Sequence, residues 1–305
     1  MSRFLYFLVI KPLSLMPLSL LYLLSDFLFF VMFHATSYRK AVVYTNLKNS
    51  FPDKSESEIL KIQKDFFVHL CDVIVESVKL FSISKDELMR RFKITNTDVL
   101  NKYYHQGRSV ILVGGHYNNW EIAAMSFNLY TKHQAIGIYT PLNNKFFDRK
   151  FGESRTRYGM EIIPKSLVPR SFVGNQSRLT VTVFGADQSP TYSKQVHWLT
   201  FLNQETAVHS GTERFSVKYN YPVVFFRLNK VKRGYYEGVY EVLHEQPGST
   251  GHGEITALHT RRLEEVIKEN PAYWLWSHKR WKRKKTEAER QEELAMNTVQ
   301  KLAGL

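Results

Sequence analysis

Cysteine is almost absent from this sequence, whose 305 residues include a single one, Cys71. One cysteine excludes an intramolecular disulfide and any zinc site built from cysteine thiolates. Cys71 lies within an apolar helical pattern, which favours a role in core packing over a reactive role. The sequence therefore gives no sign that folding depends on an oxidising compartment.

Several common signatures are also missing. The sequence has no internal repeat, no phosphate-binding loop of the Walker type, no zinc-finger spacing and no aromatic pattern typical of RNA-recognition motifs. The formal net charge of +14 is nevertheless large, and basic surfaces attract nucleic acids, anionic membranes and acidic proteins alike. Without a nucleic-acid motif, we expect this charge to serve a membrane or an acidic partner, and we expect no nucleic acid as a partner.

The sequence does contain a long apolar segment from Phe4 to Phe33, in which Lys11 and Asp26 are the only charged residues. The part after Pro12 is long enough to cross a hydrocarbon core of about 30 Å as a helix. Because prolines and Asp26 interrupt a plain span, a kinked helix lying in or dipping into the membrane is an alternative. A buried core helix is the third possibility, whereas no small-x-small site supports a cleaved signal peptide.

Basic residues follow this apolar segment directly. Arg39, Lys40 and Lys48 come next in the chain, and positive charge beside a membrane segment favours the cytoplasmic side for the body that follows. We therefore expect a membrane anchor over residues 1–35, a globular domain over residues 36–285 and a polar C-terminal extension over residues 286–305. A chain of this length accommodates one large domain with such appendages.

The central part of the chain alternates between helical and β-rich segments. Residues 56–81 carry apolar residues in steps of three and four, which predicts a long amphipathic helix, and Ser55 with Glu58 forms a capping box before it. The alternation that follows is typical of an α/β sheet with helices on both faces, where sites gather beyond the carboxyl ends of strands. One helical stretch is predicted over residues 205–220. The predicted strands begin at Ser109, Gln134, Met160, Leu179, Pro222 and Tyr235.

The most informative motif is "RSVILVGGHYNNWE", residues 108–121, in which a predicted strand ends at two glycines and His116 follows at once. The Gly114–Gly115 pair permits a sharp turn, which leaves His116 in a loop and Glu121 in the first turn of the next helix. We therefore expect these two side chains to meet. A carboxylate bonded to one ring nitrogen fixes the imidazole tautomer and makes the other nitrogen a better base.

This pair favours proton transfer over other chemistry. No serine or cysteine is arranged nearby as a nucleophile, so in the simplest mechanism His116 takes a proton from a substrate hydroxyl, which then attacks an acyl carbon. In the alternative interpretation, His116 forms loop hydrogen bonds and Glu121 is a charge at a helix N-terminus. Two ligands with no third nearby do not make a metal site, so none is expected.

Four further segments carry a family resemblance. They are "YRKAVVYTNLKNSFP" at residue 38, "ESRTRYG" at residue 153, "FGADQSP" at residue 184 and "NPAYWLWSHKRWKRK" at residue 270. Together with "GGHYNNWE", in this order and behind an apolar N-terminus, they resemble the late, lauroyl- and myristoyl-type acyltransferases of lipid A biosynthesis. That family belongs to the wider glycerolipid acyltransferase superfamily, and the resemblance covers about residues 4 to 285.

The resemblance implies a fold, a reaction and a set of site residues. The fold is a mixed sheet flanked by helices, behind an N-terminal membrane helix. The reaction moves a fatty acyl chain from a thioester, usually acyl carrier protein or else acyl-CoA, to a hydroxyl of a lipid A precursor, with no cofactor. The location implied is the bacterial inner membrane, with the catalytic domain on the cytoplasmic side. The implied catalytic residues are His116 and Glu121, and the implied substrate-binding residues are Arg155, Arg157, Asp187, Gln188, Lys279 and Arg280.

The basic stretch "SHKRWKRKK", residues 277–285, belongs to this resemblance. We expect its tryptophans to hold the chain against apolar surface, while Lys279, Arg280 and Lys282 face outward towards lipid phosphates or an acidic carrier protein.

The chain also departs from the family pattern. Many members have an Asp-x-Asp sequence followed by glycine, whereas this chain has Ser189 at the second acidic position and lacks the glycine. Asn118 and Asn119 stand where other members often have small or apolar residues. The acceptor and the acyl chain therefore stay open, and an aminolipid or a lysophospholipid is an alternative acceptor. A non-catalytic basic protein of the membrane surface is the alternative from another class.

Overall fold

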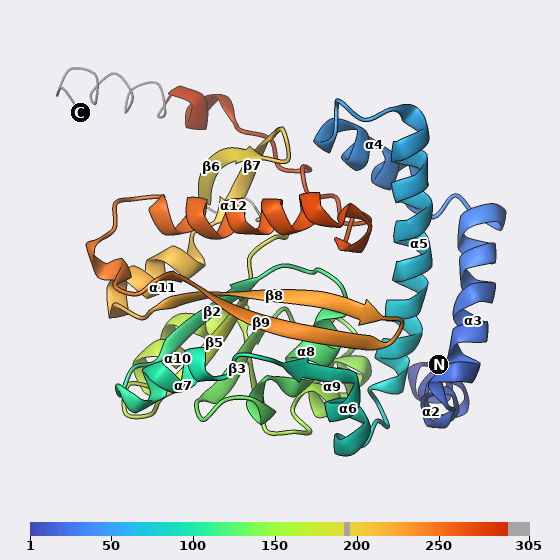
Figure 1. Ribbon diagram of the computed structural model, residues 1–305, viewed down its shortest axis with the longest axis horizontal. Coiled ribbons are helices and arrows are strands. Elements are labelled where there is room, and N and C mark those ends of the chain that lie inside the picture. The colour runs from blue at the N-terminus through green and yellow to red at the C-terminus, as the bar shows by residue number, and fades with distance from the viewer. Residues whose placement is uncertain (192–195, 292–305) are drawn as a thin grey trace.

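The computed structural model describes residues 1–191 and 196–291, and it has an α/β architecture (Figure 1). A seven-stranded mixed sheet in the order β1-β9-β8-β2-β5-β3-β4 forms its centre, and a two-stranded sheet is formed by β6 and β7. The predicted mixed sheet flanked by helices is confirmed. The strands are β1 (Phe92–Ile94), β2 (Val110–Gly114), β3 (Gln134–Tyr139), β4 (Glu161–Pro164), β5 (Thr180–Gly185), β6 (Val196–Phe201), β7 (Gln204–His209), β8 (Val223–Lys232) and β9 (Tyr235–His244).

Helices cover both faces of the seven-stranded sheet. Figure 1 shows α12 on one side of the sheet and α7, α8 and α9 on the other, while Phe172 of α10 packs with Phe215 of α11 on the α12 side. The long helix is confirmed as α5, and its capping box is complete, since Ser55 and Glu58 exchange side-chain and backbone hydrogen bonds. The helices are α1 (Ser2–Leu5), α2 (Lys11–Leu15), α3 (Leu18–Phe30), α4 (Lys40–Ser50), α5 (Glu56–Lys79), α6 (Lys85–Arg91), α7 (Asp98–His105), α8 (Trp120–Ser126), α9 (Lys145–Arg155), α10 (Val168–Gly174), α11 (Gly211–Tyr219) and α12 (Glu254–Glu269).

The centre of the sheet is buried on both faces, which explains why β2 reads as a continuous apolar run. Val113 lies in a core cluster with Leu263 and Ile267 of α12. Leu112, the neighbouring residue, lies in a separate cluster with Ile122 of α8. Successive side chains of a strand point to opposite faces, so the two clusters are the cores of the two sheet–helix layers.

The six predicted strands are all present, but the prediction for residues 205–220 is wrong in its first half. Residues Gln204–His209 form β7, which pairs in antiparallel register with β6, and only Gly211–Tyr219 are helical. The turn between β6 and β7 has Leu202 and Asn203 at φ of 49° and 60°. A tight turn that joins two β-rich runs, rather than helical propensity, decides the structure here.

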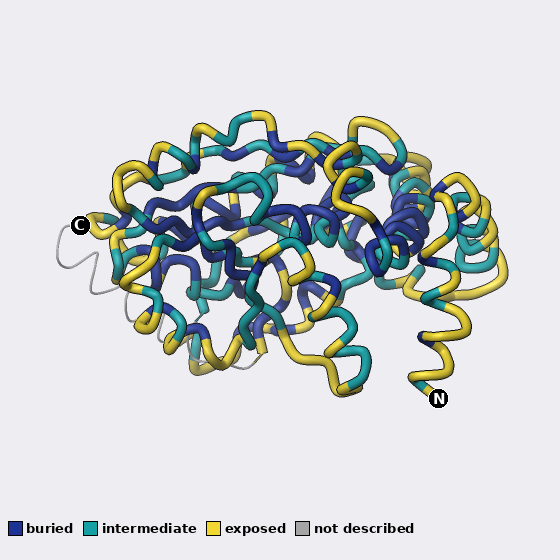
Figure 2. The backbone as a smooth tube through the Cα atoms, turned by 90° about the horizontal axis from the view of Figure 1, so that it is seen from below, coloured by how far each residue is buried: buried dark blue, intermediate teal, exposed yellow. Residues whose placement is uncertain are grey.

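The N-terminal segment is a set of broken helices that pack beside α5. The break comes at Met16, which is extended because it precedes Pro17. Within the described residues, Leu18–Ala35 is the one helical stretch long and apolar enough to cross a membrane. Figure 2 shows these helices at the edge of the molecule and largely exposed, in contrast to the buried sheet. The predicted kink is therefore present, and only 17% of this stretch is buried, which is unlike a buried core helix.

One side of α3 carries polar groups that bind α5. Tyr22 donates a hydrogen bond to Glu76 Oε1 at 2.8 Å, and Ser25 donates to Asp72 Oδ1 at 2.8 Å. Arg233, at the β8–β9 turn, bridges Asp72 and Asp26 with contacts of 2.6 Å to each. The polar residues that interrupt the apolar segment therefore fix α3 to the body of the protein.

Candidate active site

The sheet register brings two sequence motifs together. β2 and β5 are adjacent and parallel, and Gly114 is directly paired with Gly185. His116 and Asp187 each follow two residues after these paired glycines. Because parallel strands end at the same edge, the two side chains lie side by side beyond the carboxyl end of the sheet.

His116 and Asp187 form a close pair. Nδ1 of the imidazole lies 2.6 Å from Asp187 Oδ1, and the backbone N–H of His116 donates to Oδ2 at 2.7 Å. Trp274 Nε1 also donates to Oδ2, at 2.8 Å. The carboxylate therefore accepts three hydrogen bonds, which orient it and leave Nε2 of His116 as the ring nitrogen that does not contact Asp187.

The electrostatics of this pair follow from its burial and charges. Burial by itself lowers the pKa of His116, but the negative charge and hydrogen bond of Asp187 outweigh burial and raise that pKa above its ordinary value. Burial would raise the pKa of Asp187, yet the same pairing with His116 lowers it well below its usual range. Asp187 is therefore a carboxylate at neutral pH, and Nδ1 of His116 keeps its proton.

Gly115 and Gly185 permit close packing at the site, and neither has a left-handed backbone conformation. A Cβ atom on Gly115 would lie 2.9 Å from Leu263 and 3.1 Å from Asp187 Oδ2, and one on Gly185 would lie 3.2 Å from the His116 ring. The residue with positive φ is Asn118, at 52°. Its buried side chain donates to the Leu228 carbonyl at 2.7 Å, which stabilises the turn.

The expected contact between His116 and Glu121 is not formed, and this corrects the prediction from the motif. Glu121 instead accepts two hydrogen bonds from Arg155, from Nε at 2.9 Å and from Nη2 at 2.6 Å. Glu121 lies in the first turn of α8, as expected, but its side chain reaches Arg155 at the end of α9. It influences His116 only through its charge, which helps to raise the pKa of that residue.

Gln188 completes the immediate surroundings of His116. Its amide Nε2 lies 3.2 Å from Nε2 of His116, on an exposed side chain. Since Nδ1 carries the proton, the amide donates to the lone pair on Nε2. A substrate hydroxyl that displaced Gln188 would meet the same lone pair.

A large cavity opens in front of His116. Its volume is about 760 Å³, within the range of about 300–1,000 Å³ that is usual for small-molecule sites. His116, Glu121, Arg155 and Gln188 line it together with many apolar side chains. The apolar lining includes Trp120, Ala123, Phe127, Ile138, Met160, Val183 and Phe184. Such a cavity suits a long apolar group whose polar end lies at His116.

The segment from Tyr273 to His278 packs against the loop that carries His116. Leu275 N donates to the His116 carbonyl at 3.2 Å, and Asn118 N donates to the Tyr273 carbonyl at 2.9 Å. Asn46 of α4 in turn donates to the carbonyls of Trp276 and His278, at 2.9 and 3.1 Å. Two of the segments that carry the family resemblance, those that begin at residues 38 and 270, therefore hold the loop that carries His116.

The structure divides the predicted binding residues into two groups. Arg155, Asp187 and Gln188 lie at the site, whereas Arg157 donates to the carbonyls of Leu80 and Phe81, beyond the end of α5. This contact gives Arg157 a structural position instead of one in the cavity.

Arg280 is buried, which corrects the expectation that it faces outward. It is 2% exposed and donates to the Ala207 carbonyl at 2.7 Å, while Lys279 and Lys282 are exposed as predicted. Burial lowers the pKa of Arg280 to about 10. Residues 279–285 run without regular structure, and Arg280, Trp281, Arg283 and Lys285 are buried while Lys279, Lys282 and Lys284 are exposed.

The sequence motifs did not predict that Asp187 pairs with His116, or that Trp274 donates a hydrogen bond to Asp187. A signal was available for Asp187, since it follows a predicted strand at the same offset as His116 follows its own. No local signal marks Trp274.

Comparison with known proteins shows the family of the chain. The sequence profile described as bacterial lipid A biosynthesis acyltransferase matches residues 1–283. The chain is 23% identical over 246 residues to the lipid A biosynthesis palmitoleoyltransferase of Escherichia coli strain K12, covering 80% of this chain and 79% of that protein. A lipid A biosynthesis acyltransferase of Shigella flexneri matches with the same identity and coverage. The chain therefore belongs to the bacterial lipid A biosynthesis acyltransferase family and is an acyltransferase.

Proposed function

We propose that this acyltransferase is bound to the bacterial inner membrane and moves a fatty acyl chain from acyl carrier protein to a hydroxyl of a lipid A precursor, with His116 as the general base. The observation that carries the proposal is the His116–Asp187 pair at the mouth of a large apolar cavity. An aminolipid or lysophospholipid acceptor finds no separate support in the site. Family membership leaves the non-catalytic alternative without support.

The reaction follows from the position of the free ring nitrogen. Nε2 of His116 takes the proton of the acceptor hydroxyl while the oxygen attacks the thioester carbonyl. The tetrahedral intermediate then collapses and the carbon–sulfur bond breaks. The proton passes from His116 to the departing thiolate, so the products are an ester and a free thiol. Asp187 stays ionised throughout and stabilises the imidazolium that forms.

Arg155 is the second functional group of the proposed site. Its guanidinium has five N–H donors, and Glu121 accepts from two of its nitrogens, which fixes the plane of the group at the cavity wall. An arginine held in this way suits a phosphate or the developing oxyanion. We therefore assign Glu121 to positioning Arg155 rather than His116.

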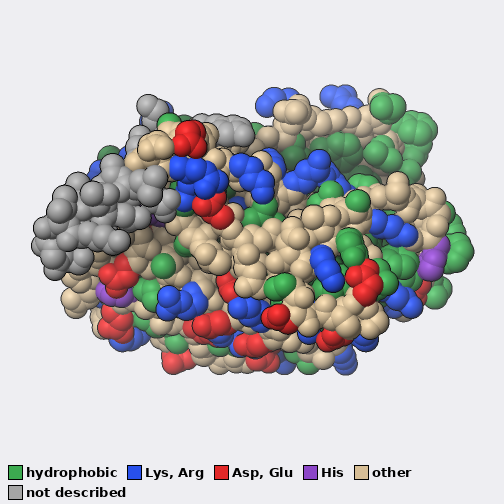
Figure 3. Space-filling view, turned by 90° about the horizontal axis from the view of Figure 1, so that it is seen from above, with side chains coloured by type: hydrophobic (Ala, Val, Ile, Leu, Met, Phe, Trp, Pro, Cys, Tyr) green, Lys and Arg blue, Asp and Glu red, His purple; other side chains and the backbone are tan. Residues whose placement is uncertain are grey.

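The proposed membrane association rests on the outer side of the N-terminal helices. Leu20, Leu23, Phe27 and Phe30 of α3 are exposed, while the polar side of the helix binds α5. Figure 3 shows hydrophobic side chains gathered at this end of the molecule. Asp26 is paired with Arg233 midway along the apolar stretch, which favours a helix lying in the interface over a plain span. The catalytic domain lies on the cytoplasmic side in this proposal, as the basic residues after the segment indicate.

The test is acyl transfer by the purified protein on vesicles that contain a lipid A precursor. We expect acyl carrier protein loaded with a fatty acid to acylate the precursor faster than acyl-CoA at equal concentration, as measured by mass spectrometry of the lipid. We also expect the protein to sediment with the vesicles. Transfer only to lysophospholipid, or no transfer from either donor, would contradict the proposed reaction.

The exposed lysines of the basic stretch at residues 277–285 lead to a further prediction. Lys279, Lys282 and Lys284 are exposed, so reversing all three to glutamate should weaken binding of the acidic carrier protein without unfolding the enzyme. We expect KM for the donor to rise about tenfold or more at low salt, with little change in kcat, and the difference to shrink as salt screens the charges.

The matched control reverses Lys61 and Lys64 on the exposed side of α5, outside this stretch. A donor KM that is unchanged in the triple variant, or raised equally in the control, would remove Lys279 from the proposed binding surface.

A further inference from the structure

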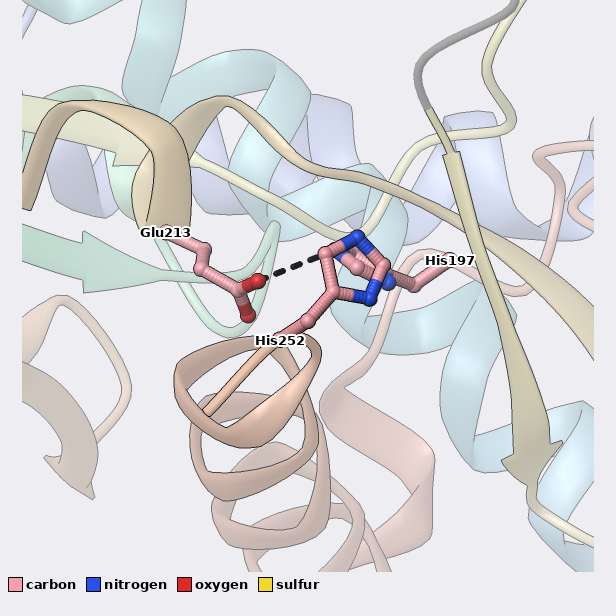
Figure 4. Close-up of side chains that lie close together, drawn as sticks. All are labelled: His197, Glu213 and His252. Atoms are coloured by element: carbon pink, nitrogen blue, oxygen red, sulfur yellow. Dashed lines mark ion pairs between the residues drawn. The ribbon is translucent and has the colours of Figure 1, made fainter. Parts of the chain in front are cut away.

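A cluster of side chains that could bind a metal ion lies outside the proposed catalytic site. His197 of β6, Glu213 in the first turn of α11 and His252 in the loop before α12 come together, as Figure 4 shows. Each offers one ligand atom, and these atoms lie within 4.8 Å of one another. None of the three side chains lines the large cavity.

Glu213 is the unusual member of this cluster because it is a buried anion that has no lysine or arginine partner among the described residues. Its side chain is 8% exposed, and within the described residues its one ion-pair partner is His197, at 3.2 Å. Its oxygens lie within hydrogen-bonding distance of donors on His197, Gly253 and Thr256, which favours the charged carboxylate over the protonated form. A buried charge normally requires a compensating cation.

The Glu213 carboxylate accepts hydrogen bonds of the kind that orient a ligand in a metal site. Oε2 accepts from the backbone N–H and the hydroxyl of Thr256, at 3.0 and 2.9 Å, and Oε1 accepts from Gly253 N at 2.7 Å. The second lone pair of Oε1 faces Nε2 of His197, which lies 3.2 Å away. Gly253 has a φ of 87°, and this turn places its N–H against Glu213 and His252 beside it.

The distances suit a tetrahedral ion. Zinc bonds of about 2.0–2.1 Å to imidazole nitrogen and carboxylate oxygen put neighbouring ligand atoms about 3.3 Å apart. His197 Nε2 and Glu213 Oε1 already lie 3.2 Å apart. His252 is exposed, so its ring turns inward at little cost. The rings of His197 and His252 have centroids 4.3 Å apart, so a small rotation of His252 brings both imidazoles to one ion.

We propose that His197, Glu213 and His252 bind one zinc ion, with water in the fourth position. Two imidazoles and one carboxylate are a ligand set that zinc favours. The ion would neutralise the buried charge of Glu213 and join β6, α11 and the start of α12. Gly211, Thr212 and Arg214 of α11 line the large cavity, so the ion braces one cavity wall without taking part in the chemistry at His116.

The test is zinc binding by the full chain, purified in detergent, freed of its purification tag and stripped of metal. Competition against a chromogenic chelator should give one zinc per chain for the wild type. Because His252 is exposed, His252→Gln should fold normally and bind zinc at least about tenfold more weakly. The control is His105→Gln, an exposed histidine of α7, which should bind as the wild type does.

A thermal melt supplies an independent readout. Zinc binds only the folded state of such a site, so it should raise the melting temperature of the wild type and of His105→Gln by several degrees, and that of His252→Gln much less. Equal zinc affinity of His252→Gln and wild type, or no zinc retained by the wild type at micromolar free metal, would overturn the proposal.

Discussion

Replacing His116 by alanine is expected to lower kcat for acyl transfer by about a hundredfold to ten-thousandfold, since removal of a general base typically costs this much. KM for the donor should change little, because the cavity and Arg155 stay in place. Removing the ring also leaves the Asp187 carboxylate without the hydrogen bond to Nδ1, but His116 N and Trp274 continue to donate to it. The variant should therefore remain folded.

The measurement is single-turnover transfer from acyl carrier protein, with the thermal melt as a check on folding. His105→Ala, on the exposed surface of α7, is the control for loss of an imidazole and should keep wild-type turnover. Turnover of His116→Ala within about threefold of wild type in a well-folded sample would contradict the mechanism, because no other imidazole among the described residues is paired with Asp187.

The wild-type pH profile should carry the same signature. The base must be neutral to accept a proton, so kcat/KM should fall as pH drops through the pKa of His116. Since Asp187 raises that pKa, this fall should begin at a higher pH than an isolated histidine would give.

Local patterns in the sequence predicted much of this molecule. The alternation of apolar runs located six of the strands, and the His116 motif located the residue that we propose as the base, because both depend on neighbouring residues. The motif failed for Glu121, since five residues of spacing permit a contact with His116 but do not require it. The sheet register decided the outcome and placed Asp187 against the ring instead.

The contacts that the sequence could not predict join distant segments. Arg280 and Lys279 are neighbours of similar charge, yet one is buried and the other exposed, because the path of an irregular segment decides which side faces inward. Charged residues are rarely buried, so composition argues against the observed position of Arg280. His197, Glu213 and His252 lie in three separate elements, and no spacing rule for metal ligands joins them.

The roles of Asp187 and Glu121 can be separated by replacing each carboxylate with its amide. In Asp187→Asn, the amide oxygen can still accept from His116 N and Trp274, which leaves the NH₂ group facing Nδ1. An NH₂ group donates, so Nδ1 must become an acceptor and the proton moves to Nε2. That tautomer cannot act as a base towards the substrate, and we expect kcat to fall about a thousandfold or more, as in other sites that lose an orienting carboxylate.

The tautomer of His116 can be measured directly, and it would not change if Asp187 had only a structural role. ¹⁵N NMR of labelled histidine should show the His116 proton on Nδ1 in the wild type and on Nε2 in Asp187→Asn, with a lower pKa in the variant because a negative charge is lost. Glu121→Gln is the matched control. It weakens the pair with Arg155, so it should reduce activity while leaving the proton on Nδ1 and lowering the His116 pKa less than Asp187→Asn does. If Glu121→Gln moved the proton or lowered the pKa more, Glu121 would be the residue that orients His116, as the motif by itself suggested.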